Sequence, residues 1–321
     1  MRLLKLVPDN TNIGFVRLRY WAFGITALLT VAALALVGLR GLNLGVDFIG
    51  GVMIEARFES PPSLDKLRED VDRLGVGEAA LQTFGAPNVV SIRLPLPQVG
   101  DEGATNRLIN RVEATLRADF PNIAFNRAET VSGKVSGELV RNGVIAVFLA
   151  VLGIAIFSWL RYEWQFGVST FVAIAHDVLM TLGFFALTRL EFDLNIVAAV
   201  LTIIGYSIND KIVIDDRIRE NMRKYRSMDM RALIDLSVNE TLPRTVMTSL
   251  TVLLALGSLL IFGGPVLRGF TAAMMLGVVV GTYSSIYVSS SLLITLGLEP
   301  QVLARRATPA GPAAGAERIG R

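Results

Sequence analysis

The sequence contains no cysteine, only one histidine and few charged residues, and each shortage excludes a kind of chemistry. Without cysteine, the chain forms no disulfide, no thiolate metal site and no thiol nucleophile. One histidine does not make a metal site by itself and no acidic cluster completes one, so neither a metal nor a cofactor is expected. Charged residues make up 18% of the chain, whereas they make up roughly a quarter of a typical soluble protein. This composition indicates a protein that lies in lipid.

Hydrophobic residues make up 52% of the chain and are grouped in long runs. A helix needs roughly 20 apolar residues to cross a membrane. The runs predict a polytopic α-helical membrane protein with six transmembrane helices. The first run is longer than the apolar core of an ordinary signal peptide, so we interpret it as a retained helix. The predicted helices lie near 20–39, 143–160, 166–187, 194–214, 246–262 and 269–294.

The distribution of lysine and arginine predicts the orientation of these helices, because basic residues are enriched in short cytoplasmic segments. Residues 1–19, the segment 215–244 and the tail 295–321 each carry several basic residues. The hairpins on the opposite side carry only Arg189 and Arg268. Both termini and a basic loop at 215–244 are therefore predicted to be cytoplasmic. The tail, rich in alanine, glycine and proline, is predicted to be disordered.

Residues 41–138 separate the first helix from the five-helix region at 143–294, and they are too many for a loop and too polar for lipid. Alternating and periodic apolar residues predict strands and helices in the order β-α-β-β-α-β. That order is typical of a small ferredoxin-like α+β domain. We expect the domain on the periplasmic side. Its predicted strands lie at 52–58, 80–84, 88–94 and 123–131, and its helices at 63–74 and 105–120.

The fourth predicted helix carries an acid, Asp210, within apolar sequence. Placing an aspartate at the middle of a membrane costs roughly 2.5–3.5 kcal/mol, so the side chain should face protein or water. Thr202, Tyr206 and Asp210 recur every four residues and therefore share one face of the helix. Such a polar stripe can hold water and let Asp210 gain and lose a proton. Alternatively, Asp210 lies at the cytoplasmic end and pairs with Lys211 or a basic loop residue.

Two other predicted helices carry ionisable residues. Arg244 opens the fifth helix on the same side of the membrane as Asp210, and the two residues are candidates for a charge pair. The alternative for Arg244 is an ordinary arginine at a cytoplasmic helix end. His176 and Asp177 lie in the third helix, where a histidine that titrates near neutral pH suits a proton relay. Their alternative role is a hydrogen bond between helices.

Glycine and other small residues mark two further features. In the sixth helix Gly277, Gly281 and Ser285 recur every four residues, together with Ala273 and Ser289, which predicts a seam where helices pack closely. The segment 45–51 joins the first helix to the outer domain. Glycine adopts backbone angles closed to other residues, so this segment is predicted to be a turn or hinge. Its hinge residues are Gly45, Asp47, Gly50 and Gly51.

Together these segments resemble the SecD/SecF family of protein-export membrane proteins. The resemblance rests on 45–51, on Ala175-His176-Asp177, on 205–210 with the following Asp216-Arg217, on 241–245 and on 281–287. It implies a subunit that pairs with SecD, in a fold akin to resistance-nodulation-division transporters, in the bacterial inner membrane. It also implies work with the SecYEG channel, YajC and YidC to export unfolded preproteins by the proton-motive force. In the family, the residues that match Asp210 and Arg244 are implicated in proton passage.

The chain departs from the family at Asp215, where an aromatic residue is usual before Asp216-Arg217. Two adjacent acids can alter the cytoplasmic mouth of a proton path or the charge of Asp210. Two other functions remain open: a proton-driven exporter of small molecules, and a structural subunit that conducts no protons. No phosphate loop or nucleophile–base pair indicates an enzyme. The basic residues act as topology signals and do not indicate nucleic-acid binding.

Overall fold

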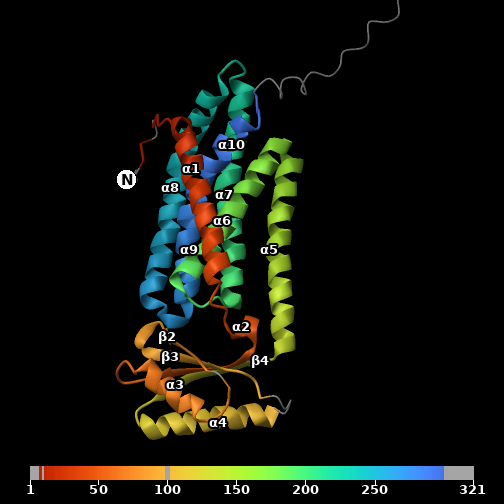
Figure 1. Ribbon diagram of the computed structural model, residues 1–321. Coiled ribbons are helices and arrows are strands. Elements are labelled where there is room, and N and C mark those ends of the chain that lie inside the picture. Colours follow the sequence, from red (N-terminus) through yellow and green to blue (C-terminus); the bar gives the residue numbers. More distant parts are fainter. Residues whose placement is uncertain (1–6, 9–10, 78, 98–101, 300–321) are drawn as a thin grey trace, which may run out of the picture.

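The computed structural model describes residues 7–8, 11–77, 79–97 and 102–299, and in this part of the chain six helices are long and apolar enough to cross a membrane. The prediction of six such helices is therefore confirmed. They form a bundle with a small α+β domain at one end (Figure 1). The six spans are α1 (Arg19–Arg40, preceded by the 3-10 turn η1, Val16–Leu18), α5 (Gly133–Arg161), α6 (Trp164–Thr188), α7 (Leu194–Lys224), α8 (Met230–Phe262) and a sixth made of α9 (Gly264–Tyr283), the π-helical segment η2 (Ser284–Ser289) and α10 (Ser290–Thr295).

The segment 215–244, predicted to be a basic loop, is helical over most of its length. Helix α7 continues to Lys224, a turn follows at 225–229, and α8 begins at Met230. The loop prediction is therefore wrong. A count of basic residues indicates the side of the membrane, but it carries no information on whether the chain there is coiled or helical.

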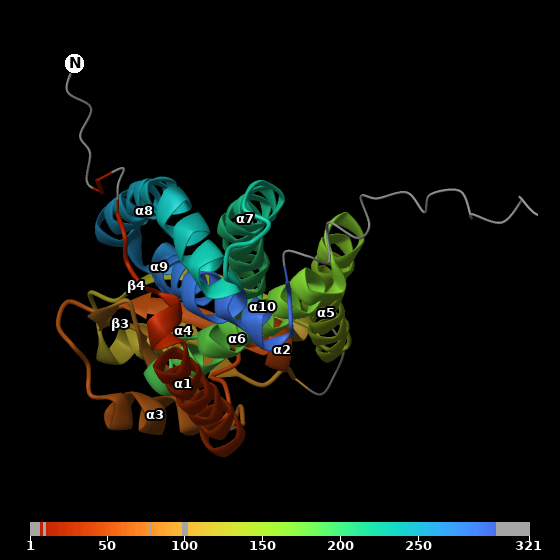
Figure 2. The same cartoon turned by 90° about the horizontal axis from the view of Figure 1, so that it is seen from above.

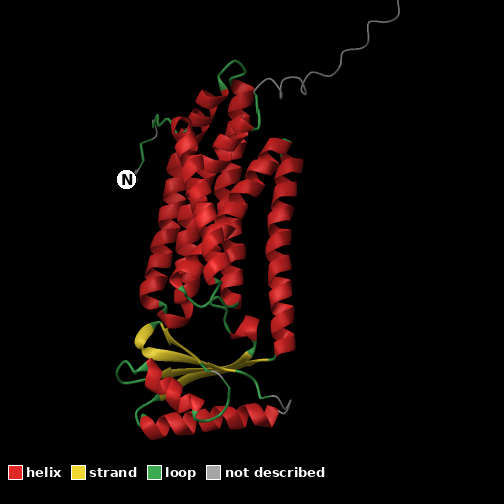
Figure 3. Cartoon of the chain, viewed as in Figure 1, coloured by secondary structure: helices red, strands yellow, loops and turns green. Residues whose placement is uncertain are grey.

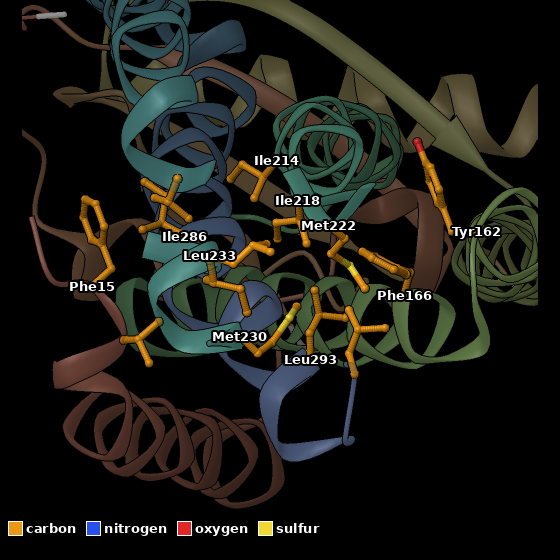
Figure 4. Packing of buried hydrophobic residues seen from close by; sticks show 14 of the residues in the cluster. Phe15, Tyr162, Phe166, Ile214, Ile218, Met222, Met230, Leu233, Ile286 and Leu293 are labelled. Atoms are coloured by element: carbon orange, nitrogen blue, oxygen red, sulfur yellow. The ribbon is translucent and has the colours of Figure 1, made fainter. Parts of the chain in front are cut away.

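A buried apolar cluster joins these helix ends and accounts for their helical structure. On α7, Ile214, Ile218 and Met222 recur every four residues and are buried. They pack with Leu233 of α8 and Phe166 of α6 in one cluster (Figure 4). An apolar stripe at helical spacing stabilises a helix by burial against its neighbours, and here it extends past the predicted span 194–214.

Helices α6, α7 and the sixth span are the most buried spans, whereas α1, α5 and α8 are the most exposed. In Figure 2, α1 and α5 lie on the outside of the bundle and α6 lies inside it. Buried residues make up 50% of the most apolar stretch of α6 and 44% of that of α7, against 11% for α1 and for α5. Polar side chains on the central helices have no access to lipid headgroups and must find partners in the protein. Functional groups are therefore expected on α6, α7 and the sixth span.

Between α1 and α5 the chain folds into a four-stranded antiparallel sheet of order β2-β3-β1-β4. The sheet lies between the helical bundle and helices α3 and α4 (Figure 3). Val52 and Ile54 of β1 are fully buried and belong to one apolar cluster with Leu67 of α3 and Leu116 of α4. The elements are β1 (Gly51–Arg57), α3 (Leu64–Asp72), β2 (Ala80–Phe84), β3 (Ala86–Leu94), α4 (Glu102–Asp119) and β4 (Ala124–Val131).

The boundaries of this domain differ from the predicted range 41–138. Helix α5 begins at Gly133, after Ser132 whose Oγ accepts a hydrogen bond from the Val135 amide at 3.3 Å. The first turns of α5 are polar, so the apolar pattern alone did not reveal them as part of a spanning helix. The short helix α2 (Val46–Ile49) lies in the linker after α1. The predicted disordered tail falls mainly on residues 300–321, which lie outside the described residues.

Candidate functional site

Asp210 lies on α7 and is 3% exposed. Its carboxylate interacts with the Thr282 hydroxyl and with the charge of Arg244. One turn earlier, Tyr206 Oη donates to Ser249 Oγ at 3.0 Å, and Ser249 Oγ lies 2.9 Å from Thr282 Oγ1. Three helices thus contribute to a connected polar group around one acid. We call Tyr206, Asp210, Ser249 and Thr282 the Asp210 cluster.

The other residues that the sequence suggested as partners of Asp210 lie outside the Asp210 cluster. Arg244 has an exposed side chain on α8, and no ion pair within the described ranges joins it to Asp210. Thr202 is exposed, and its hydroxyl bonds the backbone oxygen of Ala198 at 2.8 Å instead of extending the polar stripe. Lys211 is fully buried and forms no ion pair with Asp210 in the part of the chain that the structure describes. The pairing of Asp210 with Lys211 that the sequence left open therefore does not occur.

A second polar group surrounds Asp177, which is completely buried on α6. Asp177 Oδ1 lies 3.1 Å from His176 Nδ1. Asp177 Oδ2 accepts hydrogen bonds from Ser207 Oγ at 2.6 Å and from Ser284 Oγ at 2.9 Å. The acid therefore ties α6 to α7 and to η2. We call His176, Asp177, Ser207 and Ser284 the Asp177 cluster.

The two clusters lie on different faces of α7, and no hydrogen bond among the described residues connects them. The predicted residues His176 and Asp177 are thus brought together with each other but not with Asp210. Adjacent positions on a helix point about 100° apart, which explains why Tyr206 and Ser207 serve separate clusters.

Gly277 and Gly281 lie where the sixth span approaches α7 most closely. A Cβ at Gly277 would lie 2.4 Å from Ile203 Cγ1, and one at Gly281 would lie 3.1 Å from Ser207 Cβ. Ser285 Oγ bonds the Ser207 backbone oxygen at 3.4 Å. Absence of side chains at the two glycines lets α7 and the sixth span approach, and this approach brings η2 within reach of Asp177.

Sequence reasoning missed the π-helical segment η2. A π-turn inserts an extra residue into a helix, and such turns are frequent at functional sites. Here η2 turns Ser284 toward Asp177 and keeps Ser285 and Ser289 buried. The available signal was the density of serines in an apolar span, at positions 284, 285 and 289–291. Small residues every four positions indicated close packing but did not indicate the wider turn.

The predicted hinge is anchored to the bundle. The Gly45 amide donates to the Phe192 oxygen at 2.8 Å, and Asp47 Oδ2 accepts from the Leu194 amide at 2.9 Å, at the first residue of α7. Gly50 and Gly51 have φ angles of 77° and 123°, and a Cβ at Gly51 would lie 2.6 Å from the Leu94 oxygen. Glycine is required where the chain turns from α2 into β1. The segment therefore links the α+β domain directly to the start of α7.

Three charged residues for which the sequence suggested no site role lie where the linker meets the start of α7. They are Arg93, Arg189 and Glu191. Arg93 Nη1 donates to the Leu44 oxygen at 2.5 Å, and Arg93 Nε lies 3.9 Å from Glu191 Oε1. Arg189, with a left-handed φ of 58°, donates to the backbone oxygens of Arg40 and Gly41 at 3.0 and 2.9 Å. Burial raises the pKa of Glu191, while the Arg93 charge opposes this rise. The α6–α7 loop, the linker and β3 thus form one polar joint.

Within the described ranges, no group of three or more His, Asp and Glu side chains is placed to hold a metal ion. At the opposite end from the α+β domain, a polar pocket of about 430 Å³ opens beside the ends of α5 and α7. Tyr162 Oη donates to Asp216 Oδ1 at its edge at 2.8 Å. The pocket is lined by Arg161, Asp216, Arg219, Glu220, Arg223 and Lys224.

These features define an integral membrane protein whose spans hold buried ionisable residues, as ion-coupled transport proteins do. The chain belongs to the SecD/SecF family. Residues 111–299 match the family described as protein export membrane protein SecD/SecF, C-terminal, and residues 35–62 match the SecD/SecF GG motif. The second match includes the linker that joins α1 to the α+β domain.

The SecF relatives match over nearly their whole length. Protein translocase subunit SecF of Cereibacter sphaeroides is 43% identical, over 92% of this chain and 93% of the relative. That of Rickettsia akari is 38% identical, over 90% and 94%. The crystal structure of SecDF, a translocon-associated membrane protein from Thermus thermophilus, matches with a TM-score of 0.83 and 36% identity. That match covers 91% of this chain but 39% of the SecDF chain.

Proposed function

We propose that this chain is a SecF-type subunit which, together with SecD, uses the proton-motive force to promote translocation of unfolded preproteins across the bacterial inner membrane. Family membership supports the export role, and the buried Asp210 in a membrane-spanning helix is the observation that carries proton coupling. The SecYEG channel, YajC and YidC are the further partners that this proposal includes. Its activity is transport coupling and not catalysis.

We propose in addition that the α+β domain is a ferredoxin-like domain in the periplasm and that both termini are cytoplasmic. The strand order β2-β3-β1-β4 with two helices supports the domain assignment. The basic residues at the ends of α7 and α8 lie at the opposite end of the bundle from this domain (Figure 1). An excess of basic residues on that side supports the orientation.

The proposed cycle begins with protonation of Asp210 from the outer side. Neutral Asp210 loses its charge interaction with Arg244, and the helices that contribute to the Asp210 cluster shift. Release of the proton to the cytoplasm resets them. One charge that crosses 100 mV supplies about 2.3 kcal/mol, enough to bias a conformational equilibrium roughly fiftyfold. Because Arg244 is exposed on peripheral α8, it is available to a helix of SecD as well.

Helix α7 provides the route from this site to the outer domain. Asp210 lies on α7, and the first amide of α7 donates to Asp47 of the linker. A displacement of α7 therefore pulls on the linker and on the sheet that Arg93 joins to it. The outer domain would then hold or release an emerging chain. In this proposal His176 and Asp177 serve proton passage on the neighbouring face of α7.

The test uses membrane vesicles that contain the channel, SecD and this chain as wild type or Asp210→Asn. Completion of a preprotein already part-way across is followed with and without an imposed proton-motive force. We expect the force to accelerate the wild type and not Asp210→Asn, while Glu138→Gln, at an exposed acid of α5, behaves as wild type. An equal response of wild type and Asp210→Asn would instead indicate a subunit that does not couple protons at this residue.

A further inference from the structure

Lys211 and Asp215 are ionisable side chains that the Asp210 path does not use. They are 0% and 1% exposed. Neither Lys211 Nζ nor either carboxylate oxygen of Asp215 has a hydrogen-bond partner in the described part of the chain. Taking an ammonium and a carboxylate out of water without satisfying them is strongly unfavourable, and breaking such a pair is worse than removing both charges. A purely structural role therefore explains them poorly.

The two residues continue a line that begins at the Asp177 cluster. Ser207, Lys211 and Asp215 recur every four residues on the buried face of α7 and span about 12 Å along the helix. Ser207 donates to Asp177, and Lys211 interacts electrostatically with both Asp177 and Asp215. The line therefore runs from the middle of α6 toward the end of the bundle that is opposite the α+β domain.

Within the described ranges, a polar pocket lies at the Asp215 end of the line. Apolar side chains, among them Ile214, Ile218 and Phe166, close the core around this part of α7 (Figure 4). In contrast, Asp215 interacts electrostatically with Asp216, which is exposed and lines the pocket of about 430 Å³. Asp216 is held there by the hydroxyl of Tyr162 at 2.8 Å.

We propose that Asp177, Lys211 and Asp215 form a second proton-carrying line, separate from Asp210, which leads from the Asp177 cluster to the pocket at Asp216. This inference rests on the proposed proton-coupled function and adds a further set of proton-carrying residues to it. Besides the line itself, the ionisable groups that face it are His176 on α6 and Asp216 on α7; η2 contributes hydroxyl groups.

The transfer conserves protons and charge at each step. No acceptor lies within hydrogen-bond distance of Lys211 Nζ in the described part of the chain, so the proton would pass through a bridging water molecule. The Lys211 ammonium gives a proton to this water as the water gives one to the Asp215 carboxylate, so an N–H bond breaks, an O–H bond forms, and a neutral amine and a neutral acid result. The amine then takes a proton from the Asp177 carboxyl, which has first received that proton from the outer side. Asp215 releases its proton through Asp216 to water in the pocket. Burial disfavours the charged form of both groups, which favours the exchange of a proton between them.

The functional test compares Asp215→Asn, Lys211→Met and the double variant Lys211→Met/Asp215→Leu in vesicles that contain the channel and SecD. The double variant leaves neither charge unpaired, so it should assemble as wild type does. We expect it to lose the acceleration by the proton-motive force. Restoration of the full acceleration in the double variant, after loss in either single variant, would show a static ion pair and overturn the proposal.

A spectroscopic test is independent of export. Infrared difference spectra of the purified complex are recorded during a pH titration, and the carbonyl band of a protonated carboxyl group is followed. We expect Asp215→Asn to lack one such band and Glu138→Gln, at an exposed acid, to retain it. Spectra of Asp215→Asn that equal those of the wild type at every pH would show that Asp215 takes up no proton. If Asp210→Asn exports normally, the proposed coupling at Asp210 fails, but this band still tests Asp215 alone.

Discussion

Asp210 and Lys211 are neighbours in the chain, yet their side chains enter different surroundings. Asp210 faces Thr282 and the Arg244 charge, while Lys211 faces Asp177 and Asp215. A rotation of about 100° between adjacent helical positions separates them. At the scale of the residue, each polar group in the core is thus defined by the face of α7 on which it lies.

Single residues also determine how closely α7 and the sixth span pack. Gly277→Ala would place a Cβ 2.4 Å from Ile203 Cγ1 and 2.7 Å from Cγ2, both close to the α7 backbone. Overpacking of this kind costs about 1–3 kcal/mol. We therefore expect a lower midpoint of thermal unfolding for the purified protein. The matched control is Gly257→Ala on α8, where a Cβ would meet nothing within 4 Å. Equal midpoints for both variants would contradict this account of the seam.

At the scale of the element, α7 connects the two ends of the molecule. Its first amide bonds Asp47 in the linker, its middle carries both polar clusters, and its last turns belong to the buried cluster with α8. The turn η2 has a comparable role on the sixth span, because it brings Ser284 to Asp177. Helix α7 and the turn η2 therefore determine which polar side chains meet in the core.

The joint at the start of α7 should make stability depend on pH. Burial raises the pKa of Glu191, so the folded chain keeps the proton to a higher pH than the unfolded chain does. The free energy of unfolding therefore falls as the pH rises from the unfolded value, about 4.3, through the raised folded value. Glu191→Gln should reduce this slope, measured by thermal unfolding across that range.

Burial also raises the pKa of Asp193, which caps α7, so some slope should remain in Glu191→Gln. Glu138→Gln serves as the control, because this exposed acid lies outside the joint. It should keep the wild-type slope. The assignment of the effect to Glu191 fails if Glu191→Gln and the wild type lose stability equally with rising pH.

At the scale of the whole molecule, the α+β domain and the basic helix ends lie at opposite ends of the bundle (Figure 1). Peripheral α1, α5 and α8 expose large apolar side chains, among them Leu28, Phe148 and Leu254. Lipid or the helices of a second subunit cover such surfaces in a membrane. The arrangement leaves the central polar clusters enclosed and the peripheral helices available for contact.

The absence of cysteine makes the orientation directly testable, because any introduced thiol is the only one present. Ser60→Cys lies in an exposed loop of the α+β domain, and Ser227→Cys lies in the exposed turn between α7 and α8. We expect a membrane-impermeant maleimide to label Ser60→Cys from the periplasmic side, and Ser227→Cys only after the inner membrane is opened. The reverse pattern would invert the proposed topology.

Much of this arrangement was predictable, because it follows from local sequence. Six apolar runs specify six spans, and the period of apolar residues specifies the strands and helices of the α+β domain. Asp210, Asp177 and His176 were identifiable because an ionisable residue in an apolar run is conspicuous on its own. The helical ends of α7 and α8 were missed because their stability depends on burial of Ile214 and Leu233 against other helices.

The sequence alone determined which residues enter the membrane and which of them are ionisable, since hydrophobicity and charge are properties of each residue. Only the tertiary structure decided which of these groups meet. The rotation of α7 about its axis, set by close packing at Gly277 and Gly281, turns Ser207 to Asp177 and encloses Lys211 and Asp215. Contacts between helices depend on side chains far apart in the chain, and spacing along a single helix does not contain them.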